Sequence, residues 1–158
     1  MSGVERLKYD DDTAFTLADD ASTVARIART ATAERLRATR FDEWSGLEVL
    51  GHVADMADIF AERVRRIVAE DRPALAGADQ DAIHAERKND QRQPMEFAKR
   101  IQAAHGEIVR LLSTPANRDR VGTHAEWGEV DAAHIAAYQA RHAHGHVTEV
   151  AARFPPVN

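Results

Sequence analysis

The 158-residue sequence contains no cysteine. The chain can therefore form no disulfide bond, and a metal site in it must use histidine, aspartate or glutamate as ligands. It also has no thiol of its own to act as a nucleophile. Any thiol chemistry carried out by this protein would need a thiol that arrives as a small molecule.

Glycine and proline are scarce, at 8 and 5 residues, and they cluster between periodic segments, which favours an all-α fold. No apolar run approaches the roughly 20 residues that cross a bilayer. The first residues have no hydrophobic signal region, so we expect a cytoplasmic location. The net charge is −5, with acidic and basic residues interspersed. We therefore expect neither a nucleic-acid nor a membrane partner.

Hydrophobic periodicity predicts four principal helices in a single domain over residues 1–158, which is a helical bundle. The expected helices run from Thr13 or Leu17 to about Arg37, from Gly46 to Glu70, from Pro94 to Pro115, and from Glu129 to Phe154. The second helix should begin with a capping box, because Glu48 follows Ser45 by three residues.

The remaining segments show weaker patterns. Residues 1–12 are expected to be loosely ordered. Residues 71–93 form a polar connection in which a short helix around 79–87 is possible. Residues 118–128 are expected to form an ordered loop, with room for a small strand pair.

The second predicted helix has two adjoining apolar stripes and a polar side. The first stripe contains Leu50, Val53, Ala57, Phe60, Val64 and Ile67, and the second contains Val49, His52, Met56 and Ile59. The polar side, which we expect to face water, contains Asp58, Glu62, Arg63, Arg65 and Arg66. A single histidine, His52, therefore lies on the face that should be buried.

The last predicted helix carries His142 and His146, four residues apart. This spacing is about 400° of helical rotation, so both imidazoles leave the same side of the helix, one turn apart. Two imidazoles buried side by side without a partner would cost several kcal/mol, on the order of the cost of unmet hydrogen bonds. A metal ion bound by these two residues and His52 removes that cost and leaves a fourth position open.

The other histidines are weaker candidates. We expect His84 to be solvated, His105 to be partly exposed, and His124 to lie in a loop that could reach the mouth of the site. His134 precedes His142 by two turns and could approach the same face. His144 is about 200° around the helix from His142 and should point away.

Two carboxylates follow the predicted ligands by three residues. Asp55 follows His52, and Glu149 follows His146. Each could accept the second N–H of a metal-bound imidazole, as carboxylates often do. Each could equally be a solvated surface residue, and the sequence leaves both alternatives open.

Two stretches resemble the DinB/YfiT-like family. Residues 43–55, with Trp44-Ser45 ahead of the lone His52, are similar to the start of that family's second helix. Residues 138–147 are similar to its final-helix motif, and a Gly-Glu-Val loop at 128–130 lies between the two. The resemblance covers nearly the whole chain. One departure is Gly145, which stands where many members have a histidine.

The resemblance implies a four-helix bundle, often a homodimer, that holds a divalent metal with three histidines. Position by position these are His52, His142 and His146. Characterised relatives include thiol-dependent S-transferases and isomerases that use bacillithiol, mycothiol or glutathione.

We therefore expect a metal-dependent enzyme that activates an exogenous low-molecular-weight thiol to attack a small-molecule substrate. Two alternatives stay open. One is a hydrolase in which the metal activates water, and the other is a non-catalytic metal- or ligand-binding helical protein. Zinc or nickel is the expected metal, with iron or copper as alternatives.

Overall fold

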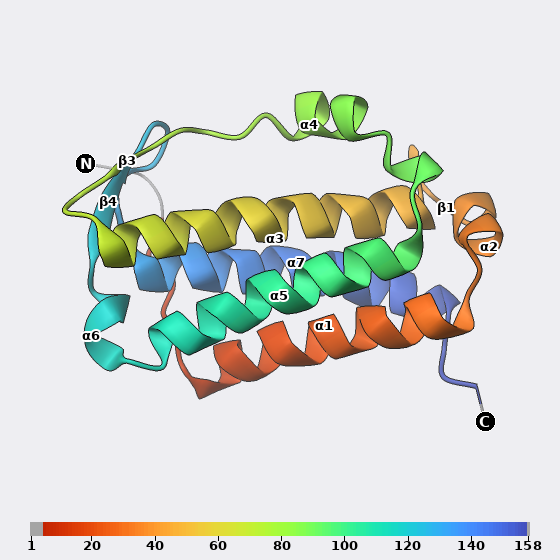
Figure 1. Cartoon of the computed structure of the whole chain (residues 1–158), viewed down its shortest axis with the longest axis horizontal. Helices are drawn as coiled ribbons and strands as arrows, with labels where there is room; N and C mark the ends of the chain where they lie inside the picture. The colour runs from red at the N-terminus through yellow and green to blue at the C-terminus, as the bar shows by residue number, and fades with distance from the viewer. Residues whose placement is uncertain (1–4, 158) are drawn as a thin grey trace.

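In the computed structural model, which describes residues 5–157, four long helices form a bundle (Figure 1). These helices are α1 (Asp11–Thr30), α3 (Gly46–Ala69), α5 (Pro94–Leu112) and α7 (Ala132–Arg153). Helices α1 and α3 each pack against both α5 and α7, so α1 lies diagonally opposite α3. The predicted four-helix bundle is confirmed, and its arrangement makes α3 and α7 direct neighbours.

The first helix begins earlier than the predicted Thr13 or Leu17. Asp10 caps α1 by accepting a hydrogen bond from the Thr13 backbone N–H, so the helix begins at Asp11. Tyr9 is buried against the bundle. Residues 5–10 thus form neither helix nor strand but lead into a capped helix, and residues 1–4 lie outside the described part of the chain.

The first helix ends earlier than predicted, because the backbone is extended at Ala31 and Thr32. The Thr32 side chain accepts a hydrogen bond from the Arg35 backbone N–H and so caps a new helix, α2 (Ala33–Ala38). Ala31 is extended at the end of α1. The apolar pattern continues across the break into the buried Leu36, which is why periodicity alone predicted one helix to Arg37.

Helix α3 begins where its sequence predicts. The Ser45 side chain accepts a hydrogen bond from the Glu48 backbone N–H, and the Glu48 carboxylate accepts one from the Ser45 backbone N–H. Strands β1 (Arg40–Phe41) and β2 (Trp44–Ser45) form a small antiparallel pair immediately before it. The first apolar stripe of α3 is buried throughout, so this helix forms the centre of the core.

The polar connection from Glu70 to Gln93 crosses over α3 and we call it the strap. It contains β3 (Ala74–Leu75), α4 (Gln80–Arg87) and the 3-10 helix η1 (Asn89–Gln91), and Figure 1 shows it above α3. The possible short helix at 79–87 is confirmed, with Asp79 as its cap.

One end of the bundle is closed by a three-stranded sheet rather than a strand pair. Strand β4 (Val121–His124) pairs antiparallel with β5 (Gly128–Asp131) and parallel with β3 of the strap. The short helix α6 (Pro115–Arg118) precedes β4. Because residues 128–131 belong to β5, α7 begins at Ala132 and not at the predicted Glu129.

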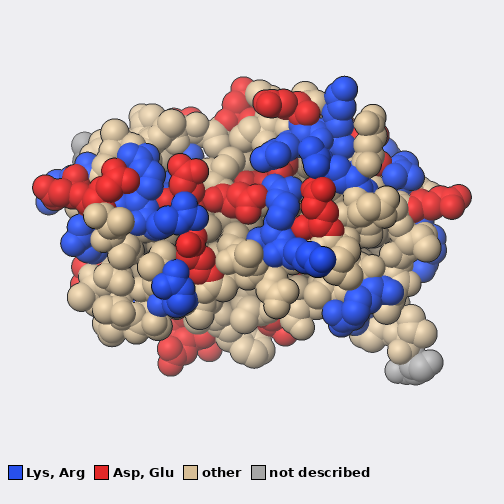
Figure 2. Space-filling model, viewed as in Figure 1, with Lys and Arg blue, Asp and Glu red and all other residues tan. Residues whose placement is uncertain are grey.

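Acidic and basic side chains interleave over the face drawn in Figure 2. Many of them pair at the surface, as Arg65 does with Glu107 and Arg72 with Glu129. This face carries no patch of one sign. Within residues 5–157, no helix has the length and apolar content that a membrane crossing requires.

Candidate metal centre

His52 of α3 meets His142 and His146 of α7 between the two neighbouring helices. One ring nitrogen from each residue lies within 4.8 Å of the other two. The three rings meet edge to face, with centroids 4.8 to 5.1 Å apart. The predicted set of histidines thus comes together around one point.

The local sequence explains this placement. His142 and His146 are one helical turn apart on α7. Each is followed by a buried residue, Ala143 or Val147, which packs this part of the helix against the core. His52 lies on the second apolar stripe of α3 and is only 3% exposed. Each histidine is therefore carried by a rigid helix whose packing fixes the direction of its side chain.

Burial keeps the three imidazoles neutral. Burial first, and then the neighbouring His142 and His146, lower the pKa of His52 to about 3. Burial and the neighbouring His146 lower the pKa of His142 to about 4, and burial lowers the pKa of His146 as well. Neutral imidazole is the form that binds a metal ion.

The spacing also fits a bound ion. The Nε2 atoms of His52 and His142 are 3.2 Å apart. With metal–nitrogen bonds of about 2.0–2.1 Å, two ligands of a tetrahedral site are separated by about 3.3 Å. Within residues 5–157 these three histidines form a potential metal-binding group without a carboxylate as a fourth member. The donor set therefore fits a three-nitrogen site with an open position.

On one side the cluster is covered by Trp44 and His84. Trp44 touches the His52 ring edge-on, at 4.9 Å between centroids, and stacks on His84 at 4.2 Å. His84 of the strap also lies 3.0 Å from the Glu48 carboxylate. His84 is therefore not the solvated residue that we expected, because the strap folds back over the start of α3.

On the other side, aromatic residues lead to a cavity. Tyr138 stacks on His142, and it also contacts Trp127 and Phe60. All four residues line a cavity of about 120 Å³, as does His124. His124 thus lines this cavity from strand β4, and not from the loop that the sequence predicts. A larger cavity, of about 510 Å³ between α1 and α5, is lined by none of the three clustered histidines.

The remaining histidines lie elsewhere. His144 points away, as predicted, and contacts Asp20 of α1 at 3.1 Å. His134 is buried, and its Nδ1 accepts a hydrogen bond from the Leu7 backbone N–H. His105 is buried, not partly exposed, because its ring lies between the Leu17 carbonyl oxygen and the Gln139 side chain.

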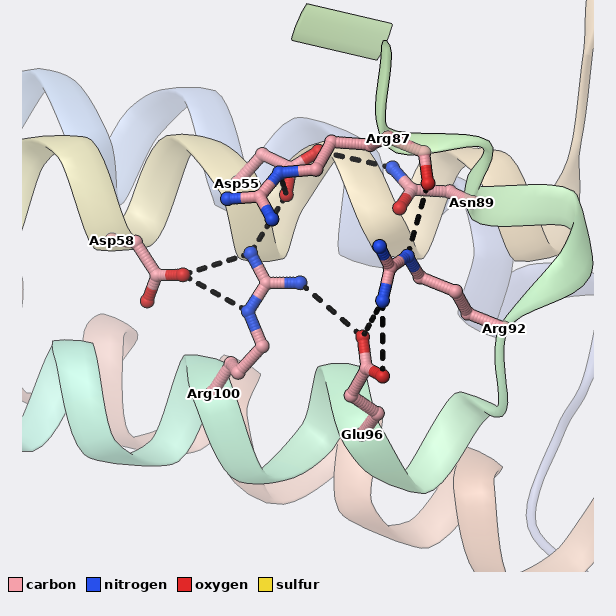
Figure 3. A network of polar contacts seen from close by, with 7 residues as sticks. All are labelled: Asp55, Asp58, Arg87, Asn89, Arg92, Glu96 and Arg100. Atoms are coloured by element: carbon pink, nitrogen blue, oxygen red, sulfur yellow. Dashed lines mark hydrogen bonds and ion pairs between the residues drawn. The ribbon is translucent and has the colours of Figure 1, made fainter. Parts of the chain in front are cut away.

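The two carboxylates near the cluster have different environments. Asp55 is 2% exposed and accepts hydrogen bonds from Asn89 of the strap and Arg100 of α5 (Figure 3). Asp55 is thus neither a partner of His52 nor a solvated residue, the two alternatives that the sequence left open. It joins α3 to the strap and to α5. Glu149 is exposed, and its charge acts on His146 in the direction that raises the pKa, against the larger effect of burial.

One residue beside the site escaped the sequence prediction. The sequence predicts that Arg63 lies on the polar side of α3 and faces water. In the structure it is only 7% exposed and lines the same cavity as His142. The strap covers it, and one of its guanidinium nitrogens donates to the Ala76 carbonyl oxygen at 2.6 Å. No periodicity within α3 could have indicated this, because the covering residues come from another segment.

Comparisons with known proteins agree with the fold. A solved structure, YfiT from Bacillus subtilis, superposes with a TM-score of 0.75 at 19% sequence identity, over 97% of this chain and 94% of that one. YfiT is described as a probable metal-dependent hydrolase with an unusual four-helix bundle topology. No curated protein matches the chain. The family model of the DinB superfamily matches residues 17–150, and the chain therefore belongs to the DinB superfamily.

Proposed function

We propose that the protein is a metal-dependent enzyme whose divalent ion is held by His52, His142 and His146. The observation that carries this proposal is the convergence of three neutral imidazoles, one buried and two half-buried, with nitrogens within 4.8 Å of one another. Structural metal sites are usually closed by four protein ligands, whereas catalytic sites keep one position open. Zinc or nickel suits this donor set best, with iron or copper as alternatives.

A bound ion would supply Lewis acidity, which lowers the pKa of a nucleophile placed at the open position. The protein's own residues contribute position and exclusion of water. The stack of Tyr138 on His142 and the contact of Trp44 with His52 fix two of the rings. The cavity beside His142 provides space for the second reactant.

We infer that the preferred nucleophile is a low-molecular-weight thiol, as in the thiol-dependent relatives that the chain resembles. Because the chain has no cysteine, that thiol would have to come from solution. In that reaction the thiol loses its proton to solvent and its sulfur forms a bond to an electrophilic carbon. The bond from that carbon to the leaving group breaks, and its electron pair departs with the leaving group. Hydrolysis by activated water is the second candidate, and the description of YfiT as a probable metal-dependent hydrolase favours it. A cytoplasmic location and a homodimer stay predictions.

Cobalt-loaded protein separates the two nucleophiles. We would titrate it with glutathione, bacillithiol and mycothiol, and use S-methylglutathione as a control that cannot form a thiolate. A thiol-dependent enzyme should give a saturable sulfur-to-cobalt absorption band with at least one thiol and none with the control. If no thiol changes the spectrum but activated esters are hydrolysed in a His142-dependent way, the hydrolase is correct. Absence of both would leave the non-catalytic alternative.

A further inference from the structure

Arg63 is a buried cation without a carboxylate partner. Its side chain is 7% exposed, and its guanidinium lies 5.0 Å from the centre of the Phe60 ring. Within residues 5–157, no carboxylate oxygen lies within 4.0 Å of its nitrogens, and its hydrogen bond goes to the neutral Ala76 carbonyl oxygen. Buried charges are normally paired, because an unpaired charge loses its hydration without compensation. An anion from outside the chain would supply the missing partner.

Arg63 faces the same cavity as the candidate metal centre. His142 and Arg63 both line this cavity of about 120 Å³. Phe60, Trp127 and Tyr138 form much of its wall. The volume equals roughly that of four water molecules in the liquid, which admits a carboxylate with a short carbon chain.

A second hydrogen-bond donor comes from His124. Its Nδ1 accepts hydrogen bonds from the backbone N–H groups of Glu126 and Trp127, at 3.0 and 3.2 Å. The proton of the neutral ring must therefore be on Nε2, so the ring can act as a donor. Burial and the charge of Arg63 lower the pKa of His124, which keeps the ring neutral.

Acidic residues near this cavity do not pair with Arg63. Glu126 also lines the cavity, but it is exposed and lies beyond ion-pair distance. Glu62 is exposed on the outer side of α3. Both carboxylates act on the pKa of Arg63 only as smaller effects that oppose burial. The fork of the guanidinium, which matches a carboxylate geometrically, thus stays available to a ligand.

We propose that Arg63, assisted by His124, binds the carboxylate of a small organic acid beside the three-histidine cluster. As a statement about the substrate, this inference rests on the proposed function. It adds that the substrate is an anion, or carries an anionic end, and that its carboxylate lies on the Arg63 side of His142. Arg63 would then determine specificity and position the substrate.

The test uses metal-free protein, so that the metal itself cannot bind the acid. Propionate, its neutral analogue propionamide, and inorganic phosphate are titrated while the guanidinium N–H signals are followed by NMR. Propionate should bind saturably and shift the Arg63 signal, and propionamide should not bind. Binding should weaken at least tenfold in Arg63→Met and less in Arg63→Lys, which keeps the charge. The matched control is Arg65→Met, because Arg65 is exposed on the same helix and pairs with Glu107.

Several results would overturn the proposal. One is that wild type and both Arg63 variants bind propionate equally well. Another is that wild type binds propionamide as well as propionate, or binds phosphate and not propionate. The last is that no saturable binding of propionate is seen. In cobalt-loaded protein, the ion should also accelerate proton relaxation of bound propionate, and unchanged relaxation would refute the location beside the cluster. If the protein takes up no cobalt, the proposed function fails, while the metal-free titration still decides whether Arg63 binds a carboxylate.

Discussion

Gly51, immediately before His52, lies where α3 meets the strap. A Cβ atom at this position would be 2.3 Å from Cγ of Asn89, a residue that is fully buried. Asn89 in turn donates a hydrogen bond to Asp55 at 3.0 Å. The absence of a side chain at residue 51 therefore allows the strap to lie against the helix that carries one of the proposed metal ligands.

Gly51→Ala should destabilise the protein by about 1–3 kcal/mol, because the new methyl group overpacks a rigid, buried contact. Gly106→Ala is the matched control, since it is also helical and nothing lies within 4 Å of its added Cβ. That control should stabilise the protein by about 0.5–1 kcal/mol through helix propensity. Urea unfolding of both variants checks this, and equal effects at the two positions would contradict it.

The sequence predicted some residue environments and not others, depending on what determines each of them. The separation of His144 from His142 follows from helical rotation within one segment, and it was predictable. The burial of His105 and Arg63 was not, because it depends on partners from other elements: Leu17 and Gln139 for His105, and the strap for Arg63. Side chains covered by distant segments leave no periodic signal in their own helix.

At the scale of elements, a polar network joins the strap to α3 and α5. Asp55 of α3 accepts hydrogen bonds from Asn89 and from Arg100, the latter at 2.7 Å, and Arg87 lies 3.4 Å away (Figure 3). Arg100 also pairs with Asp58, which is 43% exposed against 2% for Asp55. The two aspartates thus share a partner but differ in burial.

Asp55→Ala should cost about 1–3 kcal/mol, because it leaves the buried Asn89 amide without its acceptor, whereas Arg100 keeps Asp58 and Glu96 as partners. Asp58→Ala, the control, should cost less than about 1 kcal/mol, since solvent screens an exposed pair. Hydrogen exchange should accelerate over residues 80–93 in the first variant alone. Similar stability losses in both variants would refute a special role for the buried aspartate.

Element boundaries were predictable where the signal is local. The capping box at Ser45 and Glu48 and the proline at the start of α5 both mark observed helix starts. The break at Ala31 and the sheet strand at 128–131 were missed. In the first case the apolar pattern runs through the break. In the second, β5 is the second strand of a hairpin with β4 and runs directly into α7, whose start is marked only by the Asp131 cap.

At the scale of the whole molecule, buried neutral histidines link stability to pH. Besides the three clustered residues, His105, His124 and His134 have a pKa lowered chiefly by burial. In the unfolded chain all six should titrate near their ordinary pKa of about 6.5. Below that pH the unfolded chain binds more protons than the folded one. The contribution of these histidines to the free energy of unfolding should therefore be complete above about pH 6.5 and should decrease as the pH falls below that value.

As the pH is lowered from about 6.5 to 5, the free energy of unfolding of the metal-free protein should fall. Each histidine that stays neutral in the fold should contribute about 1.4 kcal/mol per pH unit to this decrease. Denaturant unfolding at a series of pH values measures this slope. A stability that is flat or rises on acidification would contradict the burial of neutral imidazoles.

Metal content of untagged protein tests the three-histidine centre most directly. Wild type and His144→Ala should each hold one divalent ion per chain after mild purification. His52→Ala and His142→Ala should lose this ion. Their affinity for the metal should fall by more than roughly 100-fold, because mutating even a residue that only hydrogen-bonds a metal ligand can reduce the affinity that much. One ion per chain that persists in both His52→Ala and His142→Ala would show that these residues do not form the site.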